Sequence, residues 1–280
     1  MTSEILGKEL QEVLRIIEGA VSGDSGGSTD LGKRVLDVGF EMPVEILLKM
    51  VEAAEQLLRP TPPFAGSFIV VSGIDKAGKG THCFNAEMLD GVTSIYDFLA
   101  DSGKRVHTIS LPSYNTILGS IVGGYLKRKS GRVIKGEISK QYAWILWSLD
   151  RAQHNSLVAD WLREDRCSVV LSNRWVESNV VYHQAIGVDK QRILRFERNI
   201  IKQTHTIVLD ISASKVDGRF MSLDEAKDIY EDAPFLEKVR SMYLRLPELY
   251  PFGETYLIDS SRPPEIVSKD IINLLSDIRI

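Results

Sequence analysis

The sequence predicts an α/β protein, with a three-layer α/β/α domain built on a five-stranded parallel sheet and a helical extension before it. Three observations support this. Short apolar runs typical of buried strands alternate with helical patterns. A glycine-rich turn follows the first of these runs, at the point where a helical pattern begins. Before that run, residues 1–63 carry helical patterns and end in the proline-rich stretch Arg59-Pro-Thr-Pro-Pro63.

The glycine-rich turn has the spacing of a phosphate-binding loop. Gly73 permits a sharp turn, and Gly78 lets backbone N–H groups close on phosphate oxygens. Lys79 adds a positive charge at the β- and γ-phosphates, and the following helix adds its dipole. Gly80 stands where a Ser or Thr normally follows the lysine, and the hydroxyl comes one place later at Thr81. The turn predicts the P-loop NTPase class, with a purely structural strand-to-helix turn as the alternative.

Composition excludes several classes of protein. A chain of 280 residues with 44% apolar and 26% charged residues can bury a substantial core. The net charge of −4 gives no overall attraction to a nucleic acid polymer. Cys83 and Cys167 are far apart and form no C-x-x-C pair, which favours reduced thiols in a cytoplasmic protein. The sequence has neither an apolar run of membrane-spanning length nor a signal-peptide core, so no membrane partner is expected.

The extension, residues 1–63, is expected to contain two amphipathic helices. Apolar residues recur on one helical face at 3–20 and again at 43–58, and the polar, glycine-rich stretch 22–30 between them is expected to be a loop. Because short helices are not stable alone, they should pack on the main domain or on a partner.

In the main domain, residues 64–280, predicted strands and helices alternate. The strands are expected at 68–71, 105–110, 168–172, 206–211 and 255–258. The helices are expected at 79–100, 116–129, 136–164, 178–185, 190–202, 234–246 and 264–277. The polar stretch 212–233 is a candidate lid, in which Arg219 either closes over a donor nucleotide or faces solvent.

Two further segments contain the residues that relate this chain to a known family. Trp147-Ser-Leu-Asp-Arg151 matches F-x-x-x-R except for its tryptophan, and Asn173-Arg-Trp175 with Ser178 to Tyr182 matches D-R-[YH] followed by S-x-x-x-[YF] except at Asn173 and Trp175. Together with a loop that matches G-x-D-x-x-G-K-[ST]-T except at Gly80, these motifs resemble the thymidylate kinase family of P-loop nucleoside monophosphate kinases. The resemblance spans about residues 64–280 and does not cover the first 63 residues.

The resemblance implies which residues contact the phosphates. Lys79 would hold the β- and γ-phosphates of the donor, and Arg174 would bind the acceptor phosphate. Lys76 stands where eukaryotic-type members carry an arginine on the transferring phosphate. These three residues are the predicted catalytic groups. The donor-binding loop comprises Gly73, Asp75, Ala77, Gly78, Lys79, Gly80 and Thr81.

The resemblance also implies a set of acceptor contacts. Asp75 would accept a hydrogen bond from the 3′-hydroxyl of the sugar. Trp147 and Tyr182 would line the two sides of the base, and Arg151 would reach its carbonyl edge. The acceptor site further includes Arg174, Ser178 and Tyr114, the last of which stands where the family usually has an arginine on the acceptor phosphate.

The implied activity is transfer of the γ-phosphate of ATP to a pyrimidine deoxynucleoside monophosphate, with dTMP to dTDP as the first expectation. ATP and Mg²⁺ are the implied cofactors, and a homodimer is implied with its contact in the 116–164 region. No metal ligand is nominated, because Asn173 replaces the acid that lies near the metal and Gly80 lacks a hydroxyl.

Alternatives exist both for the roles of single residues and for the function of the whole protein. Trp147 and Tyr182 are compatible with core aromatics, Arg151 with a surface ion pair, Asp75 with a turn cap and Lys76 with a solvated charge. For the whole protein, one alternative is another P-loop phosphotransferase, such as a polyphosphate-using nucleotide kinase. A second is a nucleotide-binding regulatory protein without catalysis, which Asn173, Tyr114 and Gly80 would suit.

Overall fold

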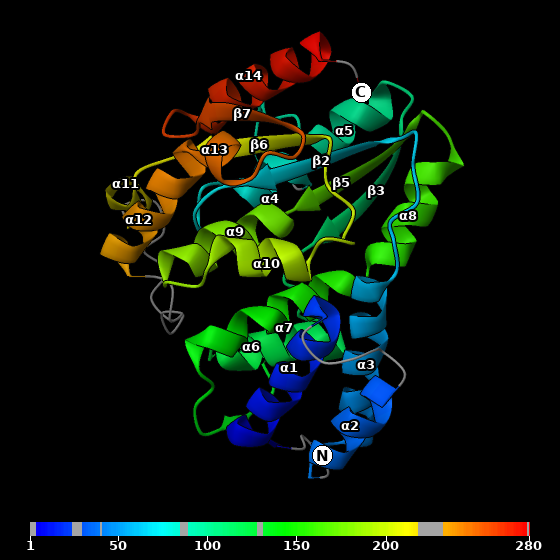
Figure 1. The fold of residues 1–280 in the computed structure, drawn as a ribbon. Coiled ribbons are helices and arrows are strands. Elements are labelled where there is room, and N and C mark those ends of the chain that lie inside the picture. The colour runs from blue at the N-terminus through cyan, green and yellow to red at the C-terminus, as the bar shows by residue number, and fades with distance from the viewer. Residues whose placement is uncertain are drawn as a thin grey trace. The chain divides into compact units, whose positions relative to one another are not determined.

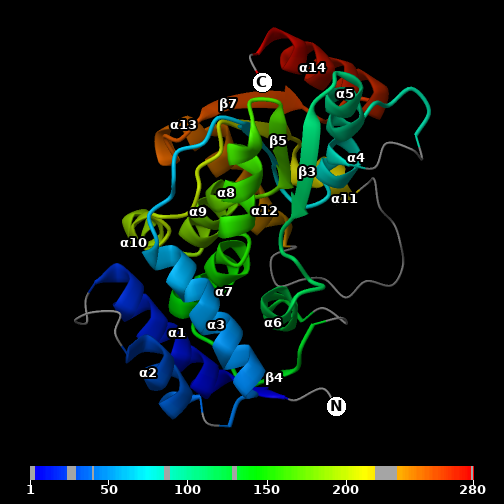
Figure 2. The ribbon, with the colours of Figure 1, turned by 90° about the vertical axis from the view of Figure 1, so that its right-hand side faces the viewer.

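The computed structural model describes residues 4–23, 30–39, 41–84, 89–127, 131–217, 232–278 and 280 (Figures 1 and 2). The chain divides into two compact units, and each is described by itself. The first unit comprises Met1–Thr61, Leu111–Ser156 and Ile186–Ile201, and the second comprises Pro62–Ser110, Leu157–Ala185 and Lys202–Ile280.

A five-stranded parallel sheet forms the centre of the second unit, as the sequence predicts. Its order is β3-β5-β2-β6-β7, and every neighbouring pair is parallel. The central strand β2 carries the run that precedes the glycine-rich turn, and its last five residues are buried. Parallel strands covered on both faces favour such continuous apolar runs. The five strands are β2 (Ser67–Ser72), β3 (Arg105–Ser110), β5 (Ser168–Asn173), β6 (His205–Asp210) and β7 (Glu254–Asp259).

Helices flank this sheet and give the predicted three-layer arrangement. Figure 1 shows α5 and α14 on one face and α9 and α12 on the other. The helices of this unit are α4 (Lys79–Cys83), α5 (Ile95–Asp101), most of α8 (Asn155–Glu164), α9 (Val176–Ala185), α11 (Ala213–Asp217), α12 (Ala233–Leu244), α13 (Leu246–Leu249) and α14 (Pro264–Asp277). Of the predicted lid at 212–233, residues 218–231, including Arg219, lie outside the described residues.

Two long predicted helices are wrong because each is interrupted. In place of a helix at 79–100, α4 ends at Cys83 and α5 begins only after Ser94, whose hydroxyl accepts from the Asp97 N–H. Gly91, with φ of 75°, lies in the connection and cannot continue a right-handed helix.

The predicted helix at 136–164 is likewise split, into α7 (Lys140–Ala152) and α8. At the break, the His154 N–H bonds to the Arg151 carbonyl three residues back. The helix predicted at 190–202 is also shorter, because α10 (Lys190–Phe196) ends six residues earlier and the Ile201 N–H donates to the Asn155 side chain.

The first unit is mainly helical. The helices predicted at 3–20 and 43–58 are confirmed as α1 and α3, whereas α2 and the two-residue parallel pair of β1 and β4 were not predicted. Of the loop predicted at 22–30, residues 24–29 lie outside the described part of the chain. The elements of this unit are β1 (Ile5–Leu6), α1 (Gly7–Ser22), α2 (Leu31–Val38), α3 (Val44–Leu58), α6 (Ile117–Tyr125), β4 (Ile134–Lys135), α7 and α10 (Lys190–Phe196).

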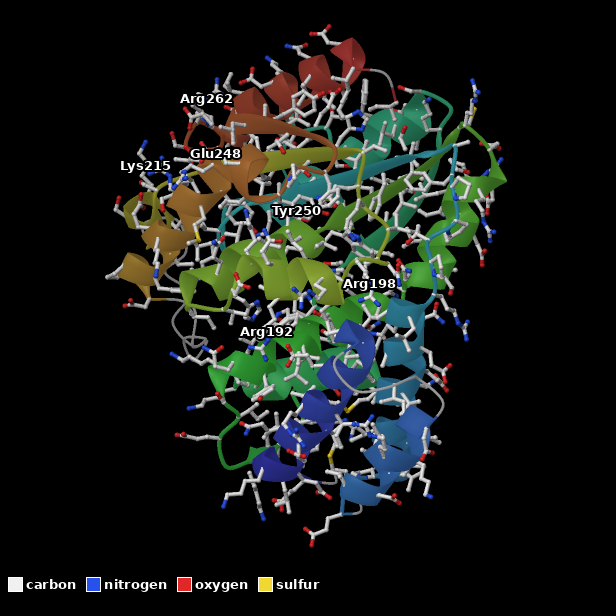
Figure 3. The ribbon with its side chains drawn as sticks, in the orientation of Figure 1. Arg192, Arg198, Lys215, Glu248, Tyr250 and Arg262 are labelled. Carbon is white, nitrogen blue, oxygen red and sulfur yellow. The ribbon has the colours of Figure 1, made fainter. Side chains whose placement is uncertain are left out.

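Helix α7 is the core of the first unit. Helices α1 and α3 both pack against it, so the extension's helices find the packing partner that short amphipathic helices need. Trp144 of α7 is fully buried and packs edge-to-face on Phe196, with ring centroids 5.1 Å apart. Arg192 of α10 pairs with Glu18 of α1 through two guanidinium nitrogens (Figure 3). Among the helices described in either unit, none is long and apolar enough to cross a bilayer.

The two glycines of the loop should respond oppositely to alanine. At Gly73, φ is 135° and an added Cβ would lie 2.5 Å from the Leu209 carbonyl oxygen, so Gly73→Ala should lower the free energy of unfolding by about 1 to 3 kcal/mol. Gly80 lies in α4 with no atom within 4 Å of an added Cβ, so Gly80→Ala should leave stability unchanged or raise it by about 0.5 kcal/mol. Urea unfolding measures both, and equal stability of the two variants would contradict this account.

Candidate functional site

The glycine-rich turn connects β2 to α4 in the second unit and has the backbone geometry that a phosphate loop requires. Gly73 and Gly78 both adopt positive φ, 135° and 93°, which favours glycine. Gly78 is the N-cap of α4, so the N–H groups of Gly80 and Thr81 belong to the first turn of that helix. Ala77, within the loop, is buried.

Lys79 is held inside the loop. Its side-chain nitrogen donates to the Ile74 carbonyl oxygen at 2.7 Å, and the residue is 7% exposed. Burial lowers the pKa of Lys79 to about 7, the Arg174 charge acts in the same direction, and Asp75 opposes them. Without an anion, this lysine is therefore partly neutral at physiological pH.

Arg174 and Asp75 form an ion pair beside the loop. Arg174 follows β5, and its Nη2 lies 2.5 Å from Asp75 Oδ1. Burial acts to raise the pKa of Asp75, but the Arg174 and Lys79 charges outweigh it, so the pKa lies below its ordinary value. Asp75 is thus a carboxylate at neutral pH and can accept hydrogen bonds from a ligand.

Tyr182 completes this group from α9. Its hydroxyl accepts from Arg174 Nη2 at 3.1 Å and lies 3.4 Å from Asp75 Oδ2. The Arg174 guanidinium also lies 4.8 Å from the Tyr182 ring centroid, within the range of a cation–π contact. The second unit therefore brings together a cation, a carboxylate and an aromatic ring that the sequence had assigned to one site.

Ser178 and Tyr243 contact the other terminal nitrogen of Arg174. Nη1 lies 3.4 Å from Ser178 Oγ and 3.2 Å from the Tyr243 hydroxyl, and the two hydroxyls are 2.7 Å apart. Ser178 was predicted. Tyr243, on α12, was missed, because no sequence pattern separates it from an ordinary core aromatic.

Lys76 and Asn173 also lie in the second unit. Lys76 is exposed in the loop, with φ of 63°. Asn173 ends β5, and its Nδ2 donates to Ser110 Oγ on β3 at 3.2 Å. Within the described part of the chain, the buried Asn173 Oδ1 atom has no hydrogen-bond partner.

A magnesium ion that arrived with a nucleotide would need most of its ligands from phosphate and water. No group of three His, Cys, Asp or Glu side chains within the described ranges could hold a metal by itself. Mg²⁺ usually keeps several waters and binds substrate phosphates, so a neutral acceptor such as Asn173 Oδ1 fits a metal-bound water. The chain's own ligands for the ion would be few.

Of the three residues predicted to bind the base, Tyr182 lies in the second unit and Trp147 and Arg151 lie in the first. Trp147 of α7 is half-buried and packs edge-to-face on Tyr125, with centroids 5.6 Å apart. Arg151 is 2% exposed, and its Nη1 lies 2.7 Å from Oε1 of the fully buried Glu197. The ion pair considered for Arg151 therefore exists, but it is buried, and the contact of Arg151 with a base stays a prediction.

Two further features of the first unit bear on the acceptor site. Glu197, which sequence reasoning missed, also accepts from Ser148 Oγ at 2.5 Å, and so joins the C-cap of α10 to two residues of α7. Tyr114 is half-buried, and its N–H donates to the Pro112 carbonyl at 3.0 Å. Its role toward an acceptor phosphate stays a prediction.

Comparisons with known proteins agree on one family. The family model described as "Thymidylate kinase" matches residues 71–271. A "Probable thymidylate kinase" from Pyrobaculum aerophilum is 28% identical over 218 residues, which is 75% of this chain and 96% of the relative. "Thymidylate kinase" from Arabidopsis thaliana is 26% identical over 212 residues, covering 76% of this chain and 72% of the relative. A solved structure of the Candida albicans enzyme has a similar fold, with a TM-score of 0.55 at 19% identity, covering 77% of this chain and 93% of that one.

Binding of a triphosphate should take up a proton at Lys79. At pH 8 the lysine is mostly neutral, and a phosphate ligand would restore its charge, so uptake should approach about one proton. Titration calorimetry with ATP at pH 8, in buffers of different ionisation enthalpy, measures this uptake. The variant Lys79→Arg keeps a permanent charge and should show none. Identical binding heats in all buffers for the wild-type protein would contradict a depressed pKa.

Proposed function

Because the chain belongs to the thymidylate kinase family, we propose that it transfers the γ-phosphate of ATP to dTMP and releases dTDP. One observation within the site carries the proposal: Lys79, Asp75 and Arg174 lie together at the phosphate loop. Lys79 and Arg174 would bind the phosphates there, and the Asp75 carboxylate would accept a hydrogen bond from a sugar hydroxyl. A phosphotransferase needs this pattern because its site supplies positive charge and orientation rather than covalent chemistry.

In the proposed reaction the loop residues hold the donor. Lys79 would leave the Ile74 carbonyl and donate to the β- and γ-phosphates, while N–H groups at Gly80 and Thr81 cap them. Lys76, exposed in the same loop, would meet the phosphate during transfer. Mg²⁺ bound with ATP would neutralise charge on the β- and γ-phosphates, with Asn173 near one of its waters.

Arg174 would hold the acceptor phosphate. In the ligand-free site its Nη2 edge is occupied by Asp75 and Tyr182, so an incoming phosphate competes with a carboxylate for that edge. The phosphate carries the larger negative charge and forms stronger charge-assisted bonds. Once the phosphate has replaced Asp75 at Nη2, Asp75 would accept a hydrogen bond from the 3′-hydroxyl of the same nucleotide.

The finer assignments are also proposals. Trp147 and Tyr182 would line the base, Arg151 would contact its carbonyl edge, and Tyr114 would lie near the acceptor phosphate. Within the first unit, α1 and α3 already cover much of α7. A homodimer contact in the 116–164 region would therefore use faces of α7 that α1 and α3 leave uncovered.

The remaining expectations concern the whole chain. We propose that residues 64–280 form the kinase domain and that residues 1–63 are an extension of it. The unpaired thiols of Cys83 and Cys167 support a cytoplasmic location, because reduced cysteines persist there.

A coupled ADP-release assay across the nucleoside monophosphates tests the function. We expect turnover with dTMP and ATP, and a fall in kcat/KM of about 100-fold in Arg174→Lys, since a lysine cannot donate from both edges as the guanidinium does. Turnover with polyphosphate in place of ATP would instead identify a polyphosphate-using kinase. No turnover with dTMP or any other monophosphate would sink the proposal.

A regulatory protein that binds nucleotides without turnover is the second candidate, and the neutral residues around the metal favour it. Asn173 offers Mg²⁺ an amide in place of a carboxylate, and Gly80 offers no hydroxyl. In that case ATP and dTMP would bind without product, and restoring Asn173→Asp and Tyr114→Arg should recover activity.

The open space around Gly80 allows a direct test of the metal. Gly80→Ser should fold normally, because an added Cβ meets no atom within 4 Å, and its hydroxyl gives Mg²⁺ a protein ligand. We expect half-maximal activity at a Mg²⁺ concentration several-fold lower than in wild type. Gly80→Ala supplies the same Cβ without the hydroxyl and is the matched control. An unchanged Mg²⁺ requirement in Gly80→Ser would place the ion elsewhere.

A further inference from the structure

A fully buried carboxylate lies beneath the phosphate-binding residues and takes no part in the reaction proposed above. Glu177, in the first turn of α9, is 0% exposed. Its Oε1 accepts from the Ser72 hydroxyl, from the Ser178 hydroxyl at 3.0 Å and from the Trp175 N–H at 3.1 Å. Its Oε2 accepts from Gln203 Nε2 at 3.1 Å. In the described part of the chain, all of these donors are neutral.

A buried negative charge is costly unless a positive charge balances it. Here the cation in the hydrogen-bond network is Arg174, whose Nη1 reaches Glu177 through the Ser178 hydroxyl, both by a direct 3.4 Å contact and by way of the Tyr243 hydroxyl. Ser178 Oγ lies 2.7 Å from the Tyr243 hydroxyl, which lies 3.2 Å from Arg174 Nη1. The carboxylate and the guanidinium are thus the two ends of one chain of hydrogen bonds.

The chemistry of the two ends fixes the direction of every bond between them. A guanidinium only donates and a carboxylate only accepts. Arg174 therefore donates to the Tyr243 oxygen, Tyr243 donates to Ser178, and Ser178 donates to Glu177. Burial raises the pKa of Tyr243 to about 12, with Arg174 opposing and Glu177 reinforcing the shift, so Tyr243 keeps the proton that this direction requires.

We propose that Glu177 and Tyr243, acting through Ser178, are positioning residues that hold the Nη1 edge of Arg174 for acceptor binding. This inference rests on the proposed function, because the orientation of Arg174 matters only if Arg174 binds the acceptor phosphate. While Ser178 and Tyr243 hold Nη1 in place, a phosphate replaces Asp75 and Tyr182 only at Nη2. Orientation before binding lowers the entropic cost of the productive geometry.

The chain offers a matched pair of tyrosines for a test. Tyr243 and Tyr250 are both 1% exposed, and both reach Glu177 through one intervening side chain. The Tyr250 hydroxyl donates to Gln203 Oε1 at 3.0 Å, and Gln203 Nε2 donates to Oε2 of Glu177, the carboxylate oxygen that Ser178 does not contact. Replacing either tyrosine by phenylalanine removes one buried hydroxyl, but only Tyr243→Phe removes a hydroxyl that contacts Arg174 and leaves Nη1 with the longer 3.4 Å contact to Ser178.

Steady-state kinetics with dTMP and ATP separate positioning from stability. We expect both variants to lower Tm, as loss of a buried hydrogen bond does. Tyr243→Phe should raise the KM for dTMP about tenfold and leave the KM for ATP unchanged, whereas Tyr250→Phe should leave both within about twofold. A KM for dTMP that is equal in the two variants would overturn the inference.

A measurement without ligand keeps this inference separate from the proposed function. Nitrogen-15 NMR reports how freely the Nη groups of Arg174 rotate, with assignment by comparison with Arg174→Lys. Rotation should be restricted in wild type and in Tyr250→Phe, and faster in Tyr243→Phe and Glu177→Gln. Equal rotation in all four proteins would refute the positioning chain even in an active kinase. A wild-type protein without turnover would sink the proposed function and leave the NMR result to decide the chain.

Discussion

The ion pair between Arg174 and Asp75 is the interaction on which the rest of the site depends, and the parallel sheet creates it. Strands β2 and β5 are neighbours, with Val71 opposite Asn173 in the register. The Arg174 N–H continues this ladder by donating to the Val71 carbonyl at 3.0 Å. Because parallel strands end at the same edge of a sheet, residues just beyond β2 and β5 meet there. Arg174 adopts a positive φ of 66° at this point, which is uncommon for a residue with a side chain.

The charges around the Arg174–Asp75 ion pair favour binding of an anion. Lys79 and Arg174 are two basic groups beside one carboxylate, and both basic side chains are largely buried. The depressed pKa of Lys79 is a consequence of that burial, with repulsion from Arg174 adding to it. Phosphate groups would relieve both effects at once, since they solvate the lysine and balance the second cation. Binding of phosphate groups would therefore stabilise the loop.

The sequence predicts the strands and the glycine-rich turn between β2 and α4 well, because local patterns determine both. Apolar runs mark the buried strands β2, β5 and β6, and Gly73, Gly78 and Lys79 are close neighbours whose spacing has a direct physical meaning. Breaks within the long helices were harder to predict: Gly91 was a usable signal, whereas the break after Ala152 depends on hydrogen bonds that form only in the fold. Tyr243 and Glu197 were missed because each acts through contacts with residues far along the chain.

A double-mutant cycle on Asp75 and Arg174 tests the central claim most directly. The quantity measured is kcat/KM for dTMP with saturating ATP in wild type, Asp75→Asn, Arg174→Lys and the double variant. If the pair works as one unit, the double variant should lose little more activity than the more damaged single variant, and the losses should be strongly non-additive. Losses that multiply independently would contradict the account, since each residue would then act without the other.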